Sequence, residues 1–343
     1  MRKHILSLLV PIPLCLACIQ VSGCTASPGD KNSADDSPAK AQLTLESGEA
    51  AQVRQTITIK GEPKIYKEQS LFTTPWGNEE GALGKEDVGG RPGPMSFTMD
   101  PFGNIVVADS INGRIVRYDE QGRVRSILKT GETLPEFVSV DTQNHTRVLL
   151  YDSLETAYRV IHFDENGDEI ENLDVFVPQP TEVFSHGEDT LVESRHSWVY
   201  KPDSSGNERN KWKPFVIGRP DQRDPDVFWS AAKNNSGNGI LLQASNRKRV
   251  LIQSISLALQ GRLLSLFSLD TDSEGNIYVG FYIDDRAELA VISPEDGLIG
   301  HLPITPIRYS SSKRFISVGR DGRVVEMRTS PEGVHFVQLD WRR

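Results

Sequence analysis

The chain has 343 residues, of which 37% are hydrophobic and 25% are charged, and its formal net charge is −9. An acidic surface repels polyanions, so this charge argues against nucleic acid or an anionic lipid surface as the partner. The many turn residues, including 28 glycines and 20 prolines, favour an all-β protein. About 300 residues fit one such domain, and no second domain is needed.

The first residues have the features of an export signal. Residues 1–4 are basic, and residues 5–20 form an apolar run that Pro11 and Pro13 interrupt. A transmembrane helix needs about 20 predominantly apolar residues, and this run is shorter. We therefore predict that residues 1–23 are a signal peptide.

The residues that follow, Val21-Ser-Gly-Cys24, resemble a bacterial lipobox, whose cysteine becomes the lipidated first residue of the mature chain. Cys15 and Cys18 lie in the removed segment, so Cys24 would have no disulfide partner. An ordinary signal peptide with nearby cleavage is the alternative. By resemblance to Gram-negative lipoproteins, Thr25 after the cysteine implies transport to the outer membrane. The mature chain would be a monomer with 36 basic and 47 acidic residues, a net charge of −11.

A polar tether is predicted after Cys24. Residues 25–40 contain no large apolar side chain and are rich in Ser, Asp, Pro and Gly. Such a segment cannot bury enough apolar surface to offset the entropy of ordering. We assign residues 24–45 to a disordered tether and residues 46–343 to the folded domain.

Residues 95–130 predict four short strands, at 96–99, 104–108, 114–118 and 123–128. Turn signals rich in Asp, Asn and Gly separate them, which indicates an antiparallel meander. A single meander of this size has two faces to cover and no core of its own. It is therefore expected to pack against copies of itself.

Five copies of the third strand follow, so that the six units begin this strand at residues 114, 159, 196, 249, 288 and 335. The hairpin at residues 99–107 recurs at 269–279 and 318–325, and more weakly at 140–148. A repeat of about forty residues is typical of β-propeller blades. We predict an all-β, six-bladed β-propeller. Seven blades, with residues 50–90 forming one more, is the alternative.

The end of the chain predicts how the ring closes. The last unit stops after its third strand, and the alternating segment 52–60 lies ahead of the first unit. We expect this N-terminal segment to supply the missing outer strand of the last blade, because an open edge would invite aggregation.

Residues 99–122 carry the pattern MD-x-x-GNI-x-VADS-x-N-x-RI-x-x-YD-x-x-G, which resembles the NHL repeat of six-bladed propellers. The resemblance implies the fold across residues 50–343. NHL-like propellers include protein-, peptidoglycan- and RNA-binding modules and several metal-dependent lyases and lactonases. The resemblance therefore implies little about activity, and the acidic charge makes the RNA-binding relatives poor models.

The histidines show no metal-ligand spacing such as H-x-x-x-H or H-E-x-x-H, although propeller ligands come from distant blades. His162, His196 and His335 fall on predicted third strands, toward the outside of the ring, which disfavours a shared metal site. His145 and His186 lie in or near first-to-second-strand turns, close to Asp141 and Glu182. These two histidines are either solvated turn residues or part of a ligand site on one face.

Two acids that follow second strands, Asp109 and Asp152, are interpreted as turn-fixing residues that bond backbone amides. Arg114, Arg159 and Arg249 are expected to pair with such acids or to extend along the blades. No G-x-S-x-G motif, phosphate-binding glycine loop or pair of catalytic carboxylates occurs.

Two irregular segments are longer than blade turns require, at residues 73–94 with Trp76 and at 203–229 with Trp212 and Trp229. Their tryptophans either contact a peptide or glycan or cover the ends of the ring. We predict a lipid-anchored binding or scaffold module for protein, peptide or glycan, without a cofactor. The alternative is a lactonase- or lyase-like enzyme with Ca²⁺ or Zn²⁺ in the central channel.

Overall fold

The computed structural model describes residues 53–85, 93–131, 133–203, 212–234, 237–307 and 312–342. The predicted signal peptide, Cys24 and the tether lie outside these residues. Every regular element in the described ranges is a β-strand. None of the described residues belongs to a helix long and apolar enough to span a membrane.

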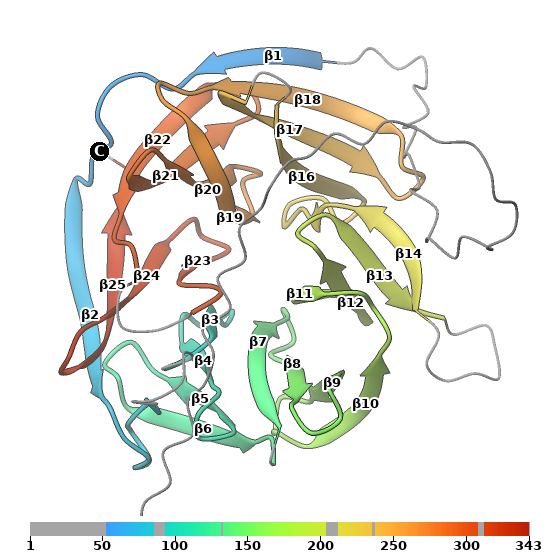
Figure 1. The fold of residues 1–343 in the computed structure, drawn as a ribbon, viewed down its shortest axis with the longest axis vertical. Coiled ribbons are helices and arrows are strands. Elements are labelled where there is room, and N and C mark those ends of the chain that lie inside the picture. The colour runs from blue at the N-terminus through green and yellow to red at the C-terminus, as the bar shows by residue number, and fades with distance from the viewer. Residues whose placement is uncertain are drawn as a thin grey trace, which may run out of the picture. The chain divides into compact units, whose positions relative to one another are not determined.

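Six antiparallel sheets follow one another around a common axis, and the all-β, six-bladed β-propeller is confirmed (Figure 1). The first three blades are continuous in sequence. Blade 1 contains β3 (Ser96–Met99), β4 (Ile105–Asp109), β5 (Arg114–Tyr118) and β6 (Val124–Lys129). Blade 2 contains β7 (Leu134–Val140), β8 (Thr146–Asp152), β9 (Ala157–Phe163) and β10 (Glu169–Val175). Blade 3 contains β11 (Pro180–His186), β12 (Asp189–Ser194), β13 (Trp198–Pro202) and β14 (Trp212–Ile217).

The last three blades include the two strands that come first in the chain. Blade 4 contains β15 (Arg219–Pro220), β16 (Val227–Lys233), β17 (Gly239–Asn246), β18 (Leu251–Ala258) and β1 (Val53–Thr58). Blade 5 contains β19 (Leu263–Thr271), β20 (Ile277–Ile283), β21 (Arg286–Ser293) and β22 (Gly297–Ile304). Blade 6 contains β23 (Ile316–Val318), β24 (Val324–Thr329), β25 (Gly333–Asp340) and β2 (Lys67–Pro75).

An N-terminal strand completes the last blade, as predicted. The strand is not in segment 52–60, however, so that part of the prediction was wrong. The strand that completes blade 6 is β2, which runs antiparallel to β25 from Lys67↔Asp340 to Pro75↔Gly333. Segment 52–60 instead contains β1, which lies parallel to β18 as a fifth strand of blade 4 (Figure 1). Ile57 and Ile59 are buried there. They belong to an apolar cluster that also contains residues of blades 4 and 5, so this segment covers apolar surface of those blades.

The predicted third strand is confirmed in five blades and wrong in blade 4. There the strand at residue 251 is the fourth, and the third is β17. The error arises because the first strand of blade 4, β15, has only two residues and gives no alternating pattern. The seven-blade alternative is excluded, since β1 and β2 join two different existing blades.

Buried residues concentrate between neighbouring blades, where each sheet covers the next. All five residues of β4 are buried, whereas the outer strand β10 exposes its first four. At the closure, the Phe72 ring of β2 lies 4.9 Å from Phe336 in blade 6 and 5.4 Å from Tyr118 in blade 1. Gly122, with a positive φ of 76°, lies directly under the Phe72 ring, where a Cβ atom would clash. Phe72 therefore joins the last blade to the first.

We predict that Phe72→Ala lowers the free energy of unfolding by about 3–5 kcal/mol, because it leaves a cavity between blades 1 and 6. Urea unfolding followed by tryptophan fluorescence measures the change. Phe176→Ala is the control, because this ring is 69% exposed and its removal should change stability by less than about 0.5 kcal/mol. Equal effects of the two substitutions would contradict the assignment of β2 as the closing strand.

Candidate functional site

A cavity of about 680 Å³ opens at one end of the channel, and turns from all six blades line it. Each blade contributes the end of its inner strand and the turn to its second strand. The main lining segments are 98–101, 139–143, 184–188, 219–223, 269–271 and 318–321. We refer to these six segments as the rim.

Aspartates fix the rim by bonding backbone amides. Asp100 Oδ1 accepts hydrogen bonds from the amides of Phe102 and Asn104, both at 2.9 Å. Equivalent bonds form at Asp141, Asp221 and Asp272. A carboxylate that accepts two backbone N–H bonds stabilises a tight turn. The rim therefore has a rigid backbone, which is held by the Oδ1 atom of each of these carboxylates.

Below the rim, Arg314 crosses the channel and links two other blades. Its Nη2 donates to Asp270 Oδ1 on β19 at 2.8 Å, and its Nη1 lies 3.3 Å from Glu182 Oε2 on β11. The neighbouring Lys313 pairs with Glu136 on β7. The segment before β23 thus brings two cations against the inner strands of blades 2, 3 and 5.

A second buried pair lies beside this one. Arg219 on β15 bonds both carboxylate oxygens of Glu193, at 3.0 and 3.1 Å, and donates to the Leu269 carbonyl at 2.8 Å. Burial opposes ionisation of Glu193, but Arg219 and His196 outweigh it and hold the pKa of this carboxyl at about 2. The two-pronged contact is the strongest geometry available to a buried arginine–carboxylate pair.

Two carboxyls in the network remain incompletely bonded. Burial raises the pKa of Glu182 and of Asp270 despite the nearby Arg314 and Arg219. Glu182 Oε1 and Asp270 Oδ2 are buried and accept no hydrogen bond from the described residues. A carboxyl in this state holds a proton at higher pH than usual, so the channel floor can accept or donate one.

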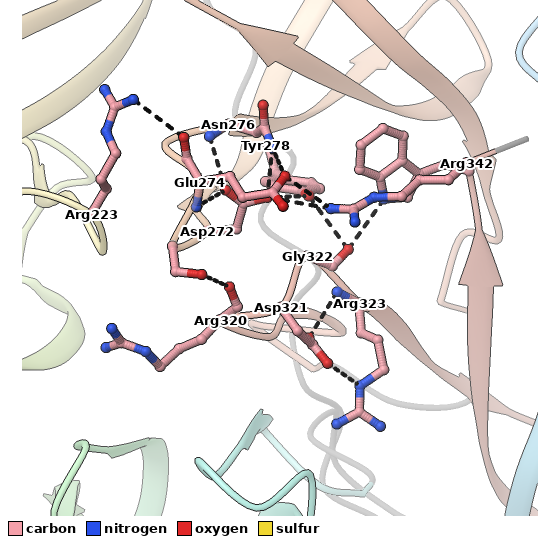
Figure 2. Close-up of polar contacts among 12 residues, drawn as sticks. Arg223, Asp272, Glu274, Asn276, Tyr278, Arg320, Asp321, Gly322, Arg323 and Arg342 are labelled. Atoms are coloured by element: carbon pink, nitrogen blue, oxygen red, sulfur yellow. Dashed lines mark hydrogen bonds and ion pairs between the residues drawn. The ribbon is translucent and has the colours of Figure 1, made fainter.

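The rim itself carries arginines whose guanidinium groups have few partners, on blades 4 and 6. Arg223 and Arg320 are exposed and line the cavity. Among the described residues, the Arg223 guanidinium donates to the Glu274 carbonyl alone, at 3.2 Å, and it packs on Gly275, where a Cβ atom would meet it. The Arg320 guanidinium has no hydrogen bond or ion pair to any described residue, although its carbonyl accepts from Ser273. Figure 2 shows the Arg223 guanidinium directed toward the Glu274 carbonyl, and the Arg320 guanidinium without a contact to the residues drawn.

Two of the predicted tryptophans lie away from the cavity. Trp76 Nε1 donates to the Ser330 carbonyl at 2.8 Å, and Trp212 Nε1 donates to the Asp174 carbonyl at 2.8 Å. Both rings are partly buried against apolar clusters at the ends of blades. Their geometry agrees with the interpretation that they cover the ring.

The other predicted site residues lie at or next to the cavity. Trp229 is 3% exposed, lines the cavity and donates to Asp221 Oδ2 at 2.9 Å. His186 lines it as well and contacts Arg247 Nη2 at 2.8 Å. Burial, followed by Arg247, lowers the pKa of His186. His145 stands at the end of the blade 2 turn, beside a second histidine, His162.

The three histidines predicted on third strands do not meet, because they lie on three different blades, and His196 lies in the turn before β13 rather than on the strand. His196 contacts Glu193, and His335 contacts Thr73 and Ser330. His162 lies on β9, as predicted, but beside His145. Sequence spacing does not reveal this pair, because a turn and the adjacent strand bring the two residues together.

The structural interpretation of the acids after second strands is supported. Asp109 accepts from the Gly84 amide and pairs with Arg114 Nε at 2.8 Å. Asp152 accepts from the amides of Leu154 and Glu155. Arg159 pairs with acids of its own blade, and Arg249 bonds two carbonyls of β14. These side chains are occupied in holding the blades.

No family model and no curated protein matches this chain. Many solved structures match this chain, and its own six sheets define the class of protein as six-bladed β-propeller. One match is a Bacteroides fragilis protein that is described as an exported protein. It has a TM-score of 0.51 and 8% identity, and the match covers 85% of this chain and 100% of that one. A gluconolactonase of Xanthomonas campestris matches with a TM-score of 0.49 and 14% identity, covering 80% and 89%. The first of these matches shows a likeness of fold alone.

We predict that Glu193→Gln lowers the free energy of unfolding by about 3 kcal/mol at pH 7, because it leaves the buried Arg219 without its paired charge. Glu182→Gln should cost less than about 1 kcal/mol, since burial already disfavours its ionised form and Arg314 keeps Asp270. Urea titrations of both variants measure the difference. Equal losses of unfolding free energy in the two variants would contradict the assignment of Glu193, rather than Glu182, as the essential charge partner of a buried arginine.

The cost of Glu193→Gln should also depend on pH. The carboxyl has an ordinary pKa of 4.5 and a pKa of about 2 in the folded chain, so its stabilisation is complete above 4.5. It is lost as the pH falls from 4.5 toward 2. The difference between the wild-type and variant unfolding free energies should therefore shrink over that range. A difference in unfolding free energy that stays constant between pH 4.5 and 2 would contradict the lowered pKa of Glu193.

Proposed function

We propose that this propeller is a binding module whose cavity receives a carboxylate-bearing part of a protein, peptide or glycan. The observation that carries the proposal is the pair Arg223 and Arg320 on the rim of the cavity. The rest of the ring acts as a rigid support that positions the rim. The partner would lie in the cell envelope.

The arginines favour an anionic group for two reasons. A guanidinium presents a planar fork of N–H donors that matches a carboxylate, and that of Arg320 has no partner among the described residues. The whole chain is acidic, with a net charge of −9, and these two arginines supply exposed positive charge at the cavity itself. The polar lining suits a glycan or peptide better than an apolar ligand.

Binding is favoured over catalysis in the channel because the channel carboxylates already have cationic partners. Arg314 lies between Asp270 and Glu182, where a metal ion would have to bind. Arg219 occupies both oxygens of Glu193. A metal-dependent reaction at the channel axis would first require these arginines to be displaced.

The location of the protein is a further part of the proposal. The residues Val21-Ser-Gly-Cys24 support lipidation at Cys24, and the NHL-like pattern of residues 99–122 supports a propeller of that type. A lipid anchor with a polar tether would hold the ring near a bilayer while leaving its rim accessible. We place the protein in the bacterial cell envelope, at the outer membrane.

Cys24→Ser in the full-length chain should move the protein from the membrane fraction to the soluble fraction of a Gram-negative host. Incorporation of labelled palmitate should be lost at the same time. Cys18→Ser is the control, because this cysteine lies in the predicted signal peptide and its loss should change neither result. Continued membrane association and labelling of the Cys24 variant would refute the anchor.

Arg320→Glu should weaken binding of carboxylate-bearing ligands at least about tenfold, because a charge-assisted pair becomes a repulsion. Titration calorimetry with soluble muropeptides, which carry carboxylates on glycan and peptide, and with an acidic peptide measures the affinity. Arg262→Glu is the matched control. Arg262 is exposed and precedes β19, at the end of that strand opposite the rim. Absence of binding by both probes, or equal loss in both variants, would contradict the proposal.

A further inference from the structure

Blade 2 brings one carboxylate and two imidazoles together on its rim side. Asp141, His145 and His162 each offer one ligand atom, and these atoms lie within 4.8 Å of one another. Asp141 and His145 stand at the two ends of the turn from β7 to β8, and their Oδ2 and Nδ1 atoms are 3.7 Å apart. His162 comes from β9, which pairs with β8. The His145 and His162 ring centroids are 5.4 Å apart.

Each imidazole has one nitrogen near a glutamate. His145 Nε2 lies 3.2 Å from Glu165 Oε2, and His162 Nδ1 lies 4.0 Å from Glu171 Oε2. The His145 contact is a hydrogen bond, and metal-ligating histidines commonly use the nitrogen that does not bind metal in this way; the 4.0 Å at His162 is longer than a hydrogen bond. The arrangement leaves His145 Nδ1 facing Asp141.

The strongest evidence for a bound ligand is the Nε2 atom of His162. This side chain is 7% exposed, and its Nε2 is buried without a hydrogen-bond partner among the described residues. Leaving a buried polar atom without a hydrogen-bond partner is costly. A bound ion is one explanation for such an atom in a folded protein.

The local charge suits a cation. Four acids, Asp141, Asp164, Glu165 and Glu171, lie in or next to the cluster, whereas Arg147 is the one cation in direct contact with it among the described residues. Arg147 Nη1 binds Asp141 Oδ2 at 2.8 Å and holds that carboxylate in place. A carboxylate oxygen has two lone pairs, so this bond does not block a metal.

We propose that Asp141, His145 and His162 form a site for a divalent transition metal, of which Zn²⁺ fits best. Two imidazoles and one carboxylate are zinc ligands, whereas Ca²⁺ and Mg²⁺ prefer oxygen alone. Zinc bonds of about 2.0–2.1 Å place tetrahedral ligand atoms about 3.4 Å apart. Shifts of about 1 Å in the side chains of a turn and a strand end therefore complete the site. Three protein ligands leave one position open.

This site is separate from the arginines of the proposed function. It lies on blade 2, whereas Arg223 and Arg320 come from blades 4 and 6. Asp141 is nevertheless part of the cavity lining, so a bound ion stands at the rim. Metal binding can be measured without any ligand, so its failure and the failure of the binding function are distinguishable.

The test is metal binding by the purified full chain. After removal of metal with a chelator, calorimetric titration with ZnCl₂ and elemental analysis of the dialysed protein should show one Zn²⁺ per chain. MgCl₂ and CaCl₂ at the same concentration should not compete. Co²⁺ should bind at the same site and give the visible absorption of a tetrahedral ion with nitrogen ligands. Zinc should raise the melting temperature.

His145→Gln should lower the zinc affinity at least about tenfold without unfolding the chain, because this side chain is partly exposed. His162→Gln should do the same, and its melting temperature without metal reports any loss of stability separately. His335→Gln, which changes a third-strand histidine of blade 6, is the matched control and should bind zinc normally. No stoichiometric zinc in the wild type, or unchanged affinity in His145→Gln and His162→Gln, overturns the proposal.

Discussion

The pairing of β2 with β25 is the interaction on which the rest of the structure depends. Each blade is a thin meander that buries its apolar faces only between two neighbours, so a ring with one open joint would expose two of them. The eight-pair register from Lys67 to Pro75 and the Phe72 ring close that joint from opposite ends of the sequence. Every blade then has two neighbours, and no disulfide is required.

Closure also brings buried acids from the inner strands of several blades close to the axis, among them Glu182 and Asp270. Arginines pair with these buried acids: Arg219 with Glu193, and Arg314 with Asp270 and Glu182. Such pairs add little net stability compared with apolar packing, but they are costly to break. They connect blades 3, 4, 5 and 6 across the axis, whereas Arg223 and Arg320 on the same rim form no ion pair with a described residue.

The sequence was sufficient for the architecture because the turn signals and alternating strands are local. It failed for β15, which is too short to alternate, and for segment 52–60, whose alternation shows that it is a strand but cannot show which edge it joins. It also predicted histidines in turns near the rim, among them His145 and His186. It could not place Arg314 against Asp270, or His162 beside His145, since closure of the ring and strand pairing bring those residues together.

The two rim features favour the same kind of ligand, although they arise independently. The guanidinium groups of Arg223 and Arg320 attract an anionic oxygen, and a zinc ion with three protein ligands has an open position that attracts one as well. Both features border one cavity, from blades 4 and 6 and from blade 2. An elongated ligand with carboxylates at two places could therefore engage both. The deep channel would not take part, because Arg314 fills the position between its acids.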